Sequence, residues 1–345
     1  MTVHVGILGG GGISETHARA AAEIPDLELA AFGGDNAAKV EALAGRYGAA
    51  AYAGTDALLR HRPMDVLLIG SPSALHAQQG IAAARAGLHV LTEKPLDVST
   101  ERADELIRSC AAAGVTLGVF FQDRFAPDLV RLKHALDEGA LGRPLLASAR
   151  VKWWRPPEYY GRSRWRGKRA WDGGGAVMNQ GIHTLDLLLW LLGDVRRVFA
   201  RQATAVHAIE VEDALIATLE FRNDALATFE ATTAAYPGYP RQLELTGTEG
   251  TVIVQQDRIA SADLRTPRED LKGGQASANA AASSPIVSDV RGHKAVIEDF
   301  LHAIKDRREP RCGGAEGRRS VELVEALYRS ARTAEPVTIG ASSFS

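Results

Sequence analysis

The sequence predicts an α/β protein with two domains, the first built on a parallel sheet and the second on a mostly antiparallel one. Its 345 residues are enough for about two domains of ordinary size. Over residues 1–123, short runs that are apolar throughout alternate with Ala-rich helical stretches, which indicates βαβ units and a buried parallel sheet. Over residues 124–345, strand-like runs follow one another with turn residues between some of them, which indicates an α+β domain.

In the first domain, strands and helices are expected to alternate along the chain. The predicted strands are Val3–Leu8, Leu27–Phe32, Val66–Gly70, His89–Thr92 and Val115–Phe120. The predicted helices are a segment that starts near Ser14 and the stretches Ala37–Arg46, Ser73–Ala86 and Thr100–Ala113. Because parallel strands end at the same edge of a sheet, the loops that follow these strands are candidate ligand-binding segments.

The second domain is expected to be mainly a sheet, interrupted by one strong helix and closed by two more. The predicted strands are Leu145–Val151, Ala214–Phe221, Ala225–Thr233, Arg241–Thr246 and Thr251–Gln255. The predicted helices are Val177–Leu192, His293–Lys305 and Arg318–Thr333. Asn and Gly residues supply turns between some of the strands, and a loop rich in Gly, Ala, Ser and Asn is expected over Lys272–Ser284.

The composition excludes several classes of protein. Forty Lys and Arg residues against 42 Asp and Glu residues leave a formal net charge of −2, which argues against a general nucleic-acid-binding protein. No apolar run approaches the roughly 20 residues needed to cross a bilayer, and the N-terminus lacks the pattern of a signal peptide. Cys110 and Cys312 are too isolated for a disulfide framework or a Cys-based zinc site. We therefore expect a soluble, cytoplasmic protein with no metal site and no nucleic-acid or membrane partner.

A run of glycines, Gly9–Gly12, lies between the first predicted strand and the first predicted helix. Glycines at this place allow a tight turn and let backbone N–H groups at the helix N-terminus approach a pyrophosphate. The third position of the G-x-G-x-x-G pattern is Ser14, which is small but not glycine. The context predicts a Rossmann domain that binds NAD or NADP, with Gly9, Gly11, Gly12 and Ile13 in contact with the cofactor.

The end of the second predicted strand bears on the choice between NAD and NADP. An acidic residue there hydrogen-bonds the ribose hydroxyls and repels the 2′-phosphate of NADP. Asp35 is near that position, but Gly34 occupies the tip if the strand ends one residue earlier, and no Arg stands beside it to hold a phosphate. The choice between NAD and NADP stays open, with NAD favoured. Asp35 is the candidate ribose contact.

Glu93, Lys94 and Pro95 follow directly after the predicted strand His89–Thr92. This is the edge at which ligands bind in open α/β sheets. A Lys there can donate a hydrogen bond to a hydroxyl or carbonyl oxygen and stabilise charge that develops on it. We interpret Lys94 as a catalytic residue, the alternative being a solvated surface lysine.

The segment Gly173–Asp186 opens the long helix of the second domain and carries a second set of reactive residue types. Asn179 and His183 are four residues apart, which places them on one face of a helix. A histidine titrates near neutral pH and therefore suits reversible proton transfer to an alcohol. The alternative is a hydrogen-bonded core histidine, but the adjacent glycines and Asn179 favour a functional one.

Together these segments resemble the glucose–fructose oxidoreductase/inositol 2-dehydrogenase (Gfo/Idh/MocA) family over nearly the whole chain. The shared motifs are the Gly loop followed by Thr16–Ala20, Ser71–Ser73 with His76, Ala86–Val90, Glu93–Pro95, Gln122–Phe125, Gly173–Asp186 and Asp299–Leu301. The resemblance implies a Rossmann domain joined to a second domain with an open sheet that often serves oligomerisation, here into a homodimer or homotetramer. It also implies NAD(P)-dependent oxidation of a secondary alcohol of a sugar, sugar acid, nucleotide sugar or polyol, or the reverse reduction.

The resemblance further implies roles for single residues, with Lys94 holding the reacting oxygen and His183 acting as acid and base. Other cofactor contacts are expected at Ser71, Pro72, His76, Glu93, Lys94, Trp165 and Arg166. Substrate contacts are expected at Lys94, Arg124, Arg155, Asn179 and His183. Asn179 stands where the family has an aspartate, so no carboxylate is expected beside His183 to raise its basicity. Asp186 is expected to orient His183 or to pack behind it.

Residues 152–169 are rich in aromatic and basic side chains. Aromatic rings and guanidinium groups suit sugar rings and carboxylates or phosphates, so we hypothesise an anionic sugar, such as a uronate or nucleotide sugar, as substrate. The alternative is a segment that packs across a domain seam. Nucleic-acid binding is disfavoured because the rest of the chain has no basic face.

Two other functions are compatible with the same fold. A dinucleotide-binding sensor without catalytic activity is one, although the presence of both Lys94 and His183 argues against it. A hydrolase or lyase that uses hydride transfer internally is the other, and tightly retained NAD without net NADH release would indicate it.

Overall fold

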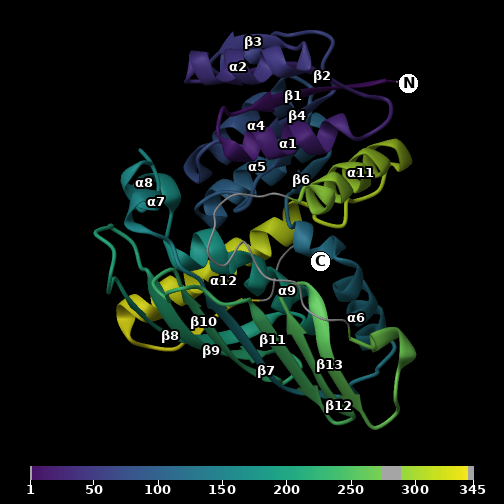
Figure 1. Ribbon diagram of the computed structural model, residues 1–345, viewed down its shortest axis with the longest axis vertical. Helices are drawn as coiled ribbons and strands as arrows, with labels where there is room; N and C mark the ends of the chain where they lie inside the picture. Colours follow the sequence, from purple (N-terminus) through teal and green to yellow (C-terminus); the bar gives the residue numbers. More distant parts are fainter. Residues whose placement is uncertain (1, 274–288, 341–345) are drawn as a thin grey trace. The chain divides into compact units, whose positions relative to one another are not determined.

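The computed structural model describes residues 2–273 and 289–340 (Figure 1), which form two compact units. The first unit contains residues 2–122 and 289–318, and the second contains residues 123–273 and 319–340. This differs from the single division after residue 123 that the sequence pattern predicts, because residues 289–318 group with the first unit. Of the loop expected over Lys272–Ser284, residues 274–284 lie outside the described residues.

The helix α11 (Arg291–Asp306) accounts for this difference. Its buried residues, among them Val296, Ile297 and Phe300, recur at helical spacing and form one apolar face. The helix packs against α1 (Gly12–Ala22). A Cβ on Gly118 of the first unit would lie 2.7 Å from the ring of Phe300. The apolar face of α11 is therefore buried on the first unit.

The first unit is built on a six-stranded sheet with the order β3-β2-β1-β4-β5-β6, and all neighbouring strands are parallel. The strands are β1 (Val3–Leu8), β2 (Leu27–Gly34), β3 (Ala50–Ala53), β4 (Val66–Ile69), β5 (His89–Thr92) and β6 (Leu117–Val119). The helices besides α1 and α11 are α2 (Ala37–Tyr47), α3 (Thr55–Leu58), α4 (His76–Arg85) and α5 (Thr100–Ala113), with a 3-10 turn at Ser73–Leu75. This order is that of the Rossmann fold, in which ligands bind where it reverses, at the carboxyl ends of the strands beside β1.

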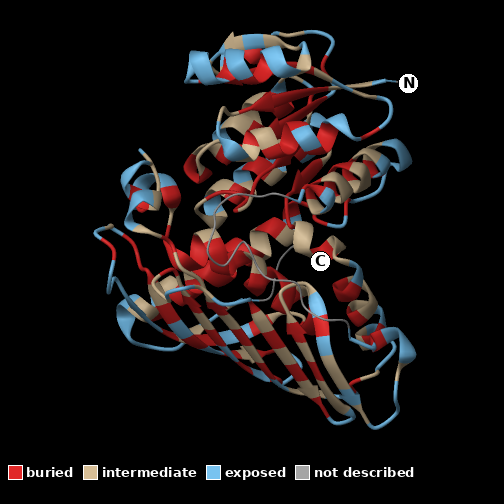
Figure 2. Cartoon of the chain, in the orientation of Figure 1, coloured by how far each residue is buried: buried red, intermediate tan, exposed pale blue. Residues whose placement is uncertain are grey.

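The central strands of this sheet are buried on both faces. Every residue of β4, which reads Val-Leu-Leu-Ile, is buried, as Figure 2 shows by the red strands of this unit. Uniform apolarity is what made these strands predictable from the sequence. The strand β3 was not predicted, since its Ala-Ala-Tyr-Ala sequence lacks the β-branched residues that favour strands.

The second unit is built on an eight-stranded sheet with the order β13-β12-β11-β7-β10-β9-β8-β14. All pairings are antiparallel except that of β7 with β10. The strands are β7 (Pro144–Lys152), β8 (Val195–Ala203), β9 (Ala214–Phe221), β10 (Leu226–Thr232), β11 (Gln242–Gly247), β12 (Gly250–Gln255), β13 (Arg258–Leu264) and β14 (Val337–Thr338). The helices are α6 (Pro127–Asp137), α7 (Pro157–Gly161), α8 (Arg169–Asp172), α9 (Ile182–Leu192) and α12 (Gly314–Thr333), whose first residues belong to the first unit. Short turns lie at Gln122–Phe125 and Glu269–Leu271. The mostly antiparallel open sheet confirms the predicted fold class.

Only one face of this sheet is covered by helices among the described residues (Figure 1). Burial alternates along β7, β9 and β10, which is the pattern of a sheet packed on one side (Figure 2). On the other face, Leu146, Ile216 and Leu226 are each more than half exposed. This apolar surface lies on three neighbouring strands.

The predicted helix Val177–Leu192 is not one regular α-helix. It begins with a π-helical turn at Val177–Gly181 and continues as α9. Gly181 packs against Phe229, where a Cβ would lie 2.9 Å from the ring. Asn179 and His183 therefore span the junction of a π-helical turn and an α-helix, and their position on one face stays a prediction.

Candidate active site

The glycine run between β1 and α1 forms a tight turn. Gly9 has a φ of +133°, and its N–H donates to the Gly33 carbonyl at 2.7 Å. A Cβ on Gly9 would lie 2.7 Å from the carbonyl oxygen of Gly70, so this position requires glycine. Gly11 and Gly12 differ from it, because a Cβ on either would meet none of the described atoms within 4 Å.

The open side of this turn fits a phosphate group. The helix α1 begins at Gly12 with Gly11 as its N-cap, and no side chain caps its first N–H groups. The buried Oγ of Ser14 also has no hydrogen-bond partner among the described residues. Uncapped N–H groups at the start of a helix favour an anion. Gly9, Gly11, Gly12 and Ile13 could therefore hold the pyrophosphate of a dinucleotide.

At the ribose end of the site, Gly34 rather than Asp35 occupies the tip of β2. The strand ends at Gly34, and a Cβ on Gly34 would lie 3.7 Å from the Cα of Gly9. Asp35 comes one residue beyond the strand and is exposed. A ribose contact by Asp35 stays a prediction.

His76 joins two of the loops at the carboxyl edge of the sheet. Its Nδ1 lies 2.7 Å from the carbonyl oxygen of Pro95, and its Nε2 lies 3.0 Å from that of Ser71. Burial lowers the pKa of His76, although its hydrogen bonds to these carbonyls act in the opposite direction. Both ring nitrogens thus contact the protein. His76 braces the loop of Ser71 and Pro72 against that of Lys94, and its direct contact with the cofactor stays a prediction.

Glu93 is the centre of a buried cluster at the end of β5. Its Oε1 lies 2.9 Å from Nε2 of His17 and 3.9 Å from Nε2 of His293, and its Oε2 accepts the backbone N–H of Lys94 at 3.2 Å. Burial acts to raise the pKa of Glu93, but the hydrogen bond from His17 and the neighbouring positive charges outweigh it and hold the pKa at about 2. The ionised carboxylate therefore fixes the backbone of Lys94.

The same three side chains come close enough to ligate a metal ion, with their donor atoms all within 4.8 Å of one another. The hydrogen bond between His17 and Glu93 already engages two of these atoms. The ring of His17 also stacks on Phe120, with ring centroids 4.3 Å apart. The cluster thus links α1, the Lys94 loop and α11 within the first unit.

In the second unit, the glycines before the π-helical turn make room for a buried carboxylate. Glu212 accepts the N–H of Gly175 and of Val177, each at 2.9 Å, and the hydroxyl of Tyr328 at 2.8 Å. A Cβ on Gly175 would collide with the backbone of Glu212, and one on Gly174 with the hydroxyl of Tyr328. Burial raises the pKa of Glu212, although these hydrogen bonds act to lower it. The glycines serve close packing around the π-helical turn.

His183 lies on the first turn of α9 beside a carboxylate that the sequence analysis did not single out. Its Nδ1 is 4.0 Å from Oδ2 of Asp123, and the two side chains are 12% and 15% exposed. Asp123 also pairs with the buried Arg241, which binds Asp257 at 2.5 Å. The expectation that no carboxylate stands beside His183 is therefore corrected, because Asp123 occupies that place.

Asn179 is held by a different acid. Its side-chain N–H donates to Asp172, whose other carboxylate oxygen accepts the N–H of Gly167 at 2.8 Å. Asp172 is fully buried. This contact fixes the amide of Asn179, and a contact of Asn179 with the substrate stays a prediction.

Arg124, expected to bind substrate, is engaged inside the second unit. It is 2% exposed, and its Nε and Nη2 each donate to Asp186 at 2.7 Å. Asp186 also accepts the hydroxyl of Ser320 at 3.2 Å. Such a buried, bidentate pair ties α9 to the turn at Gln122–Phe125. These contacts support a structural role for both Arg124 and Asp186.

The aromatic and basic segment forms a cluster around one ring. The guanidinium carbons of Arg155 and Arg166 lie 5.6 Å and 4.7 Å from the ring centroid of Tyr159. Arg155 also lies 5.1 Å from the ring of Trp153, and Arg166 lies 4.6 Å from that of Trp165. The segment thus presents guanidinium groups against aromatic rings, the combination that suits sugars and anions.

Comparison with known proteins identifies the family. The family described as "Oxidoreductase family, NAD-binding Rossmann fold" matches residues 3–121, and the "GFO/IDH/MocA C-terminal domain" matches residues 129–253. The chain belongs to the Gfo/Idh/MocA family of oxidoreductases. The predicted family, enzyme class and NAD-binding Rossmann domain are thereby confirmed.

Relatives of this Gfo/Idh/MocA oxidoreductase include several sugar dehydrogenases. The WlbA dehydrogenase of Bordetella pertussis, solved in complex with NADH and UDP-GlcNAcA, is 32% identical, with a TM-score of 0.90 and 99% of each chain covered. An inositol 2-dehydrogenase of Rhizobium meliloti (strain 1021) is 26% identical over 98% of this chain and 100% of its own. A D-glucoside 3-dehydrogenase of Escherichia coli (strain K12) is 30% identical over 67% of this chain and 70% of its own.

Several residues that build the site of this oxidoreductase had no assigned role in the sequence. Asp123 is part of the family motif Gln122–Phe125, and this motif is the only feature of the sequence that points to Asp123 as a site residue. Glu212 and Tyr328 contact the π-helical turn from positions 35 and 150 residues away along the chain. Nothing in their local sequence indicates this, so sequence reasoning could not find them.

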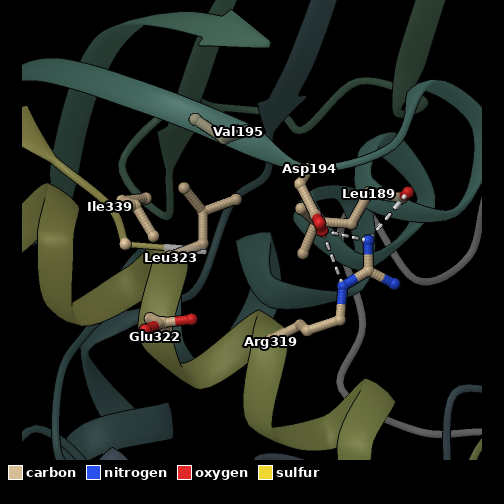
Figure 3. A pocket seen from close by; sticks show the side chains of 8 residues that line it. Leu189, Asp194, Val195, Arg319, Glu322, Leu323 and Ile339 are labelled. Carbon is tan, nitrogen blue, oxygen red and sulfur yellow. Dashed lines mark hydrogen bonds and ion pairs between the residues drawn. The ribbon is translucent and has the colours of Figure 1, made fainter. Parts of the chain in front are cut away.

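Two cavities of this oxidoreductase lie away from these residues. A cavity of about 20 Å³ is bounded by α9, β8 and α12, and Figure 3 shows the ion pair between Arg319 and Asp194, two of the residues that line it. That volume admits little more than one water molecule. A shallower hollow of about 360 Å³ lies between α4 and α5. Among the described residues, no helix combines the length and apolarity that crossing a bilayer requires.

Proposed function

We propose that this oxidoreductase is an NAD-dependent dehydrogenase that oxidises a secondary alcohol of a nucleotide-linked sugar, or carries out the reverse reduction. The observation that carries the proposal is the position of Lys94, directly after β5 in a Rossmann sheet whose glycine turn fits a pyrophosphate. The choice of a nucleotide-linked sugar rests on the likeness to the WlbA dehydrogenase, which was solved with UDP-GlcNAcA.

In this mechanism Lys94 is the electrostatic catalyst. Its ammonium donates a hydrogen bond to the reacting oxygen and stabilises the negative charge that develops there during oxidation. Glu93 holds the backbone of Lys94 through its hydrogen bond at 3.2 Å. When bound, NAD supplies the nicotinamide ring that accepts the hydride from the carbinol carbon.

His183 is the general base of the oxidation. Because Nδ1 faces Asp123, we assign the transfer of the hydroxyl proton to Nε2. The carbinol carbon loses a hydride, the oxygen loses its proton to His183, and a ketone results. Asp123 favours the charged imidazole that forms, and Arg241 holds Asp123 in place.

The remaining roles belong to the same proposal. Gly9, Gly11, Gly12 and Ile13 hold the pyrophosphate, and Asp35 contacts the ribose. Ser71, Pro72, Trp165 and Arg166 complete the cofactor site, and Asn179 contacts the sugar. NAD is favoured over NADP because no Arg accompanies Asp35 at the end of β2.

The uncovered sheet face supports a homo-oligomer, either a dimer or a tetramer. Leu146, Ile216 and Leu226 expose apolar surface on neighbouring strands, which a second copy of the chain would bury. The near-neutral net charge and the two isolated cysteines support a soluble cytoplasmic enzyme. Light scattering of the purified protein tests the assembly, and a monomer at micromolar concentration would contradict it.

The function is tested by incubating the purified protein with NAD and a panel of UDP-linked sugars, free sugars and polyols. We expect NADH to form with UDP-linked sugars and to fall to near background in the Lys94→Ala and His183→Asn variants. Calorimetry confirms in parallel that each variant still binds NAD. A protein that binds NAD yet converts no member of the panel would instead be a dinucleotide sensor.

A further inference from the structure

The segment before the catalytic turn brings two positive charges to one aromatic ring. Arg155 and Arg166 both approach the ring of Tyr159, at 5.6 Å and 4.7 Å from its centroid. Trp153 and Trp165 each flank one of these guanidinium groups. We refer to Arg155, Tyr159 and Arg166, together with Gln180, as the Tyr159 cluster.

Arg155 is held rigidly in this cluster. It is 4% exposed, and its backbone N–H donates to the Thr233 carbonyl at 2.8 Å. Its own carbonyl lies 2.8 Å from Nε2 of His207, whose Nδ1 lies 3.1 Å from the buried Asp213. Such buried networks position a side chain before any ligand arrives. The placement of Arg155 is therefore a built feature of the second unit.

Placing a second positive charge next to a buried guanidinium group is unfavourable without an anion. Burial lowers the pKa of Arg155, and the charge of Arg166 acts in the same direction against the contributions of Tyr159 and Tyr160. The buried Nε of Arg166 has no hydrogen-bond partner among the described residues. Cation–π contacts offset only part of the cost of burying such a charge.

Gln180 extends the cluster to the catalytic turn. It is 6% exposed, and its Nε2 donates to the Tyr159 hydroxyl at 3.3 Å. Its buried Oε1 has no hydrogen-bond partner among the described residues, and neither has the buried Nε1 of Trp153. Buried polar atoms in this condition are rare in proteins and point to a ligand that completes them. Because Gln180 follows Asn179 directly, that ligand would bind next to the reacting sugar.

We propose that the Tyr159 cluster binds a carboxylate carried by the sugar ring, so that the substrate is a nucleotide-linked uronic acid. Planar guanidinium groups match a carboxylate in shape and charge, and aromatic rings accommodate the sugar face. The free Oε1 of Gln180 would accept a hydrogen bond from a neighbouring hydroxyl or amide of the same sugar. The proposal rests on the proposed function and adds the substrate's charge to it.

The test compares two substrates that differ only in this group, UDP-GlcNAcA and UDP-GlcNAc, whose sugar carries a hydroxymethyl group instead of the carboxylate. We expect the natural protein to show a kcat/KM about 10- to 100-fold higher for the acid, the range of one charge-assisted hydrogen bond. The Arg155→Gln variant should lose most of this preference through a higher KM for the acid. Arg164→Gln, an exposed arginine of the same segment, is the matched control and should keep it.

A second variant keeps the test decisive if Arg155→Gln fails to fold. Gln180→Glu adds a carboxylate next to the Tyr159 hydroxyl, which would repel the carboxylate of the substrate, so it should weaken binding of the acid more than binding of the neutral sugar. Equal losses for both sugars in both variants would overturn the proposal. A raised KM for NAD alone would also overturn it and assign the cluster to the phosphates of the cofactor. If the natural protein oxidises both sugars equally well, this inference fails while the proposed function stands; if it oxidises neither sugar nor any other, the proposed function itself fails.

Discussion

In the first unit, the glycines expected to hold the pyrophosphate of NAD are neighbours in the sequence, whereas in the second unit the turn before His183 is positioned by residues far from it along the chain. Gly9, Gly11 and Gly12 act through their own backbone and the start of α1. The π-helical turn before His183 instead depends on the carboxylate of Glu212 and the hydroxyl of Tyr328. The comparison teaches that a ligand turn can be encoded locally while a catalytic helix requires tertiary contacts.

Removal of Lys94 should have the largest effect and should separate catalysis from cofactor binding. In Lys94→Ala we expect kcat to fall by about 10²–10³-fold or more, the usual loss for a positioned electrostatic donor. The affinity for NAD should stay within about threefold, because the glycine turn is built without Lys94. Steady-state kinetics and calorimetry measure both quantities. A variant that retains half of the activity would remove Lys94 from the mechanism.

Weakening the hydrogen bonds of Glu212 to the π-helical turn should cause the second-largest loss of activity. In Glu212→Gln the hydrogen bonds to Gly175 and Val177 lose their charged acceptor, so the π-helical turn should shift. We expect kcat to fall by about 10–100-fold, which is the loss that small misplacements of catalytic groups cause. The affinity for NAD should stay unchanged. Tyr328→Phe, which removes one hydroxyl from the same carboxylate, is the milder control. Unchanged kcat in Glu212→Gln would show that His183 is positioned locally after all.

The contrast also explains what the sequence could and could not predict. Uniformly apolar strands such as β4 and the motifs of Lys94 and His183 are local patterns, so the fold class and these two candidates followed from them. The polar strand β8, with Arg196, Arg197 and Arg201, offered no such pattern and was missed. Asp123 could not be assigned to His183, since only the fold brings the two side chains within 4.0 Å.

The Asp123 carboxylate beside His183 should tune the pH dependence rather than the maximal rate. A base works when it is unprotonated, so the oxidation rate should rise with pH through the pKa of His183. Asp123→Asn removes a nearby anion that favours the imidazolium, so the acidic limb should move to lower pH. Asn179→Asp adds an anion and should move the limb to higher pH. The pH dependence of kcat/KM checks both, and two unmoved limbs would mean that neither carboxylate acts on His183.

The smallest effect should come from Asp35 in the first unit. Asp35 is exposed and lies one residue beyond β2, so its contact with a ribose is at the periphery of the site. We expect Asp35→Ser to weaken the binding of NAD by only about 3- to 10-fold, in the range of a single exposed hydrogen bond. The affinity for NADP should rise relative to that for NAD. Titration calorimetry with both cofactors measures it. Identical NAD affinities of the variant and the natural protein would exclude the contact.

The central claim is that His183 accepts the hydroxyl proton during oxidation of the sugar. The most direct measurement is the rate of NADH formation against pH for the natural protein and for His183→Asn, at saturating NAD and with a UDP-linked sugar. The account predicts an acidic limb in the natural protein and its loss, with most of the activity, in the variant. The same limb in both proteins would contradict it and would show that a group other than His183 accepts the proton.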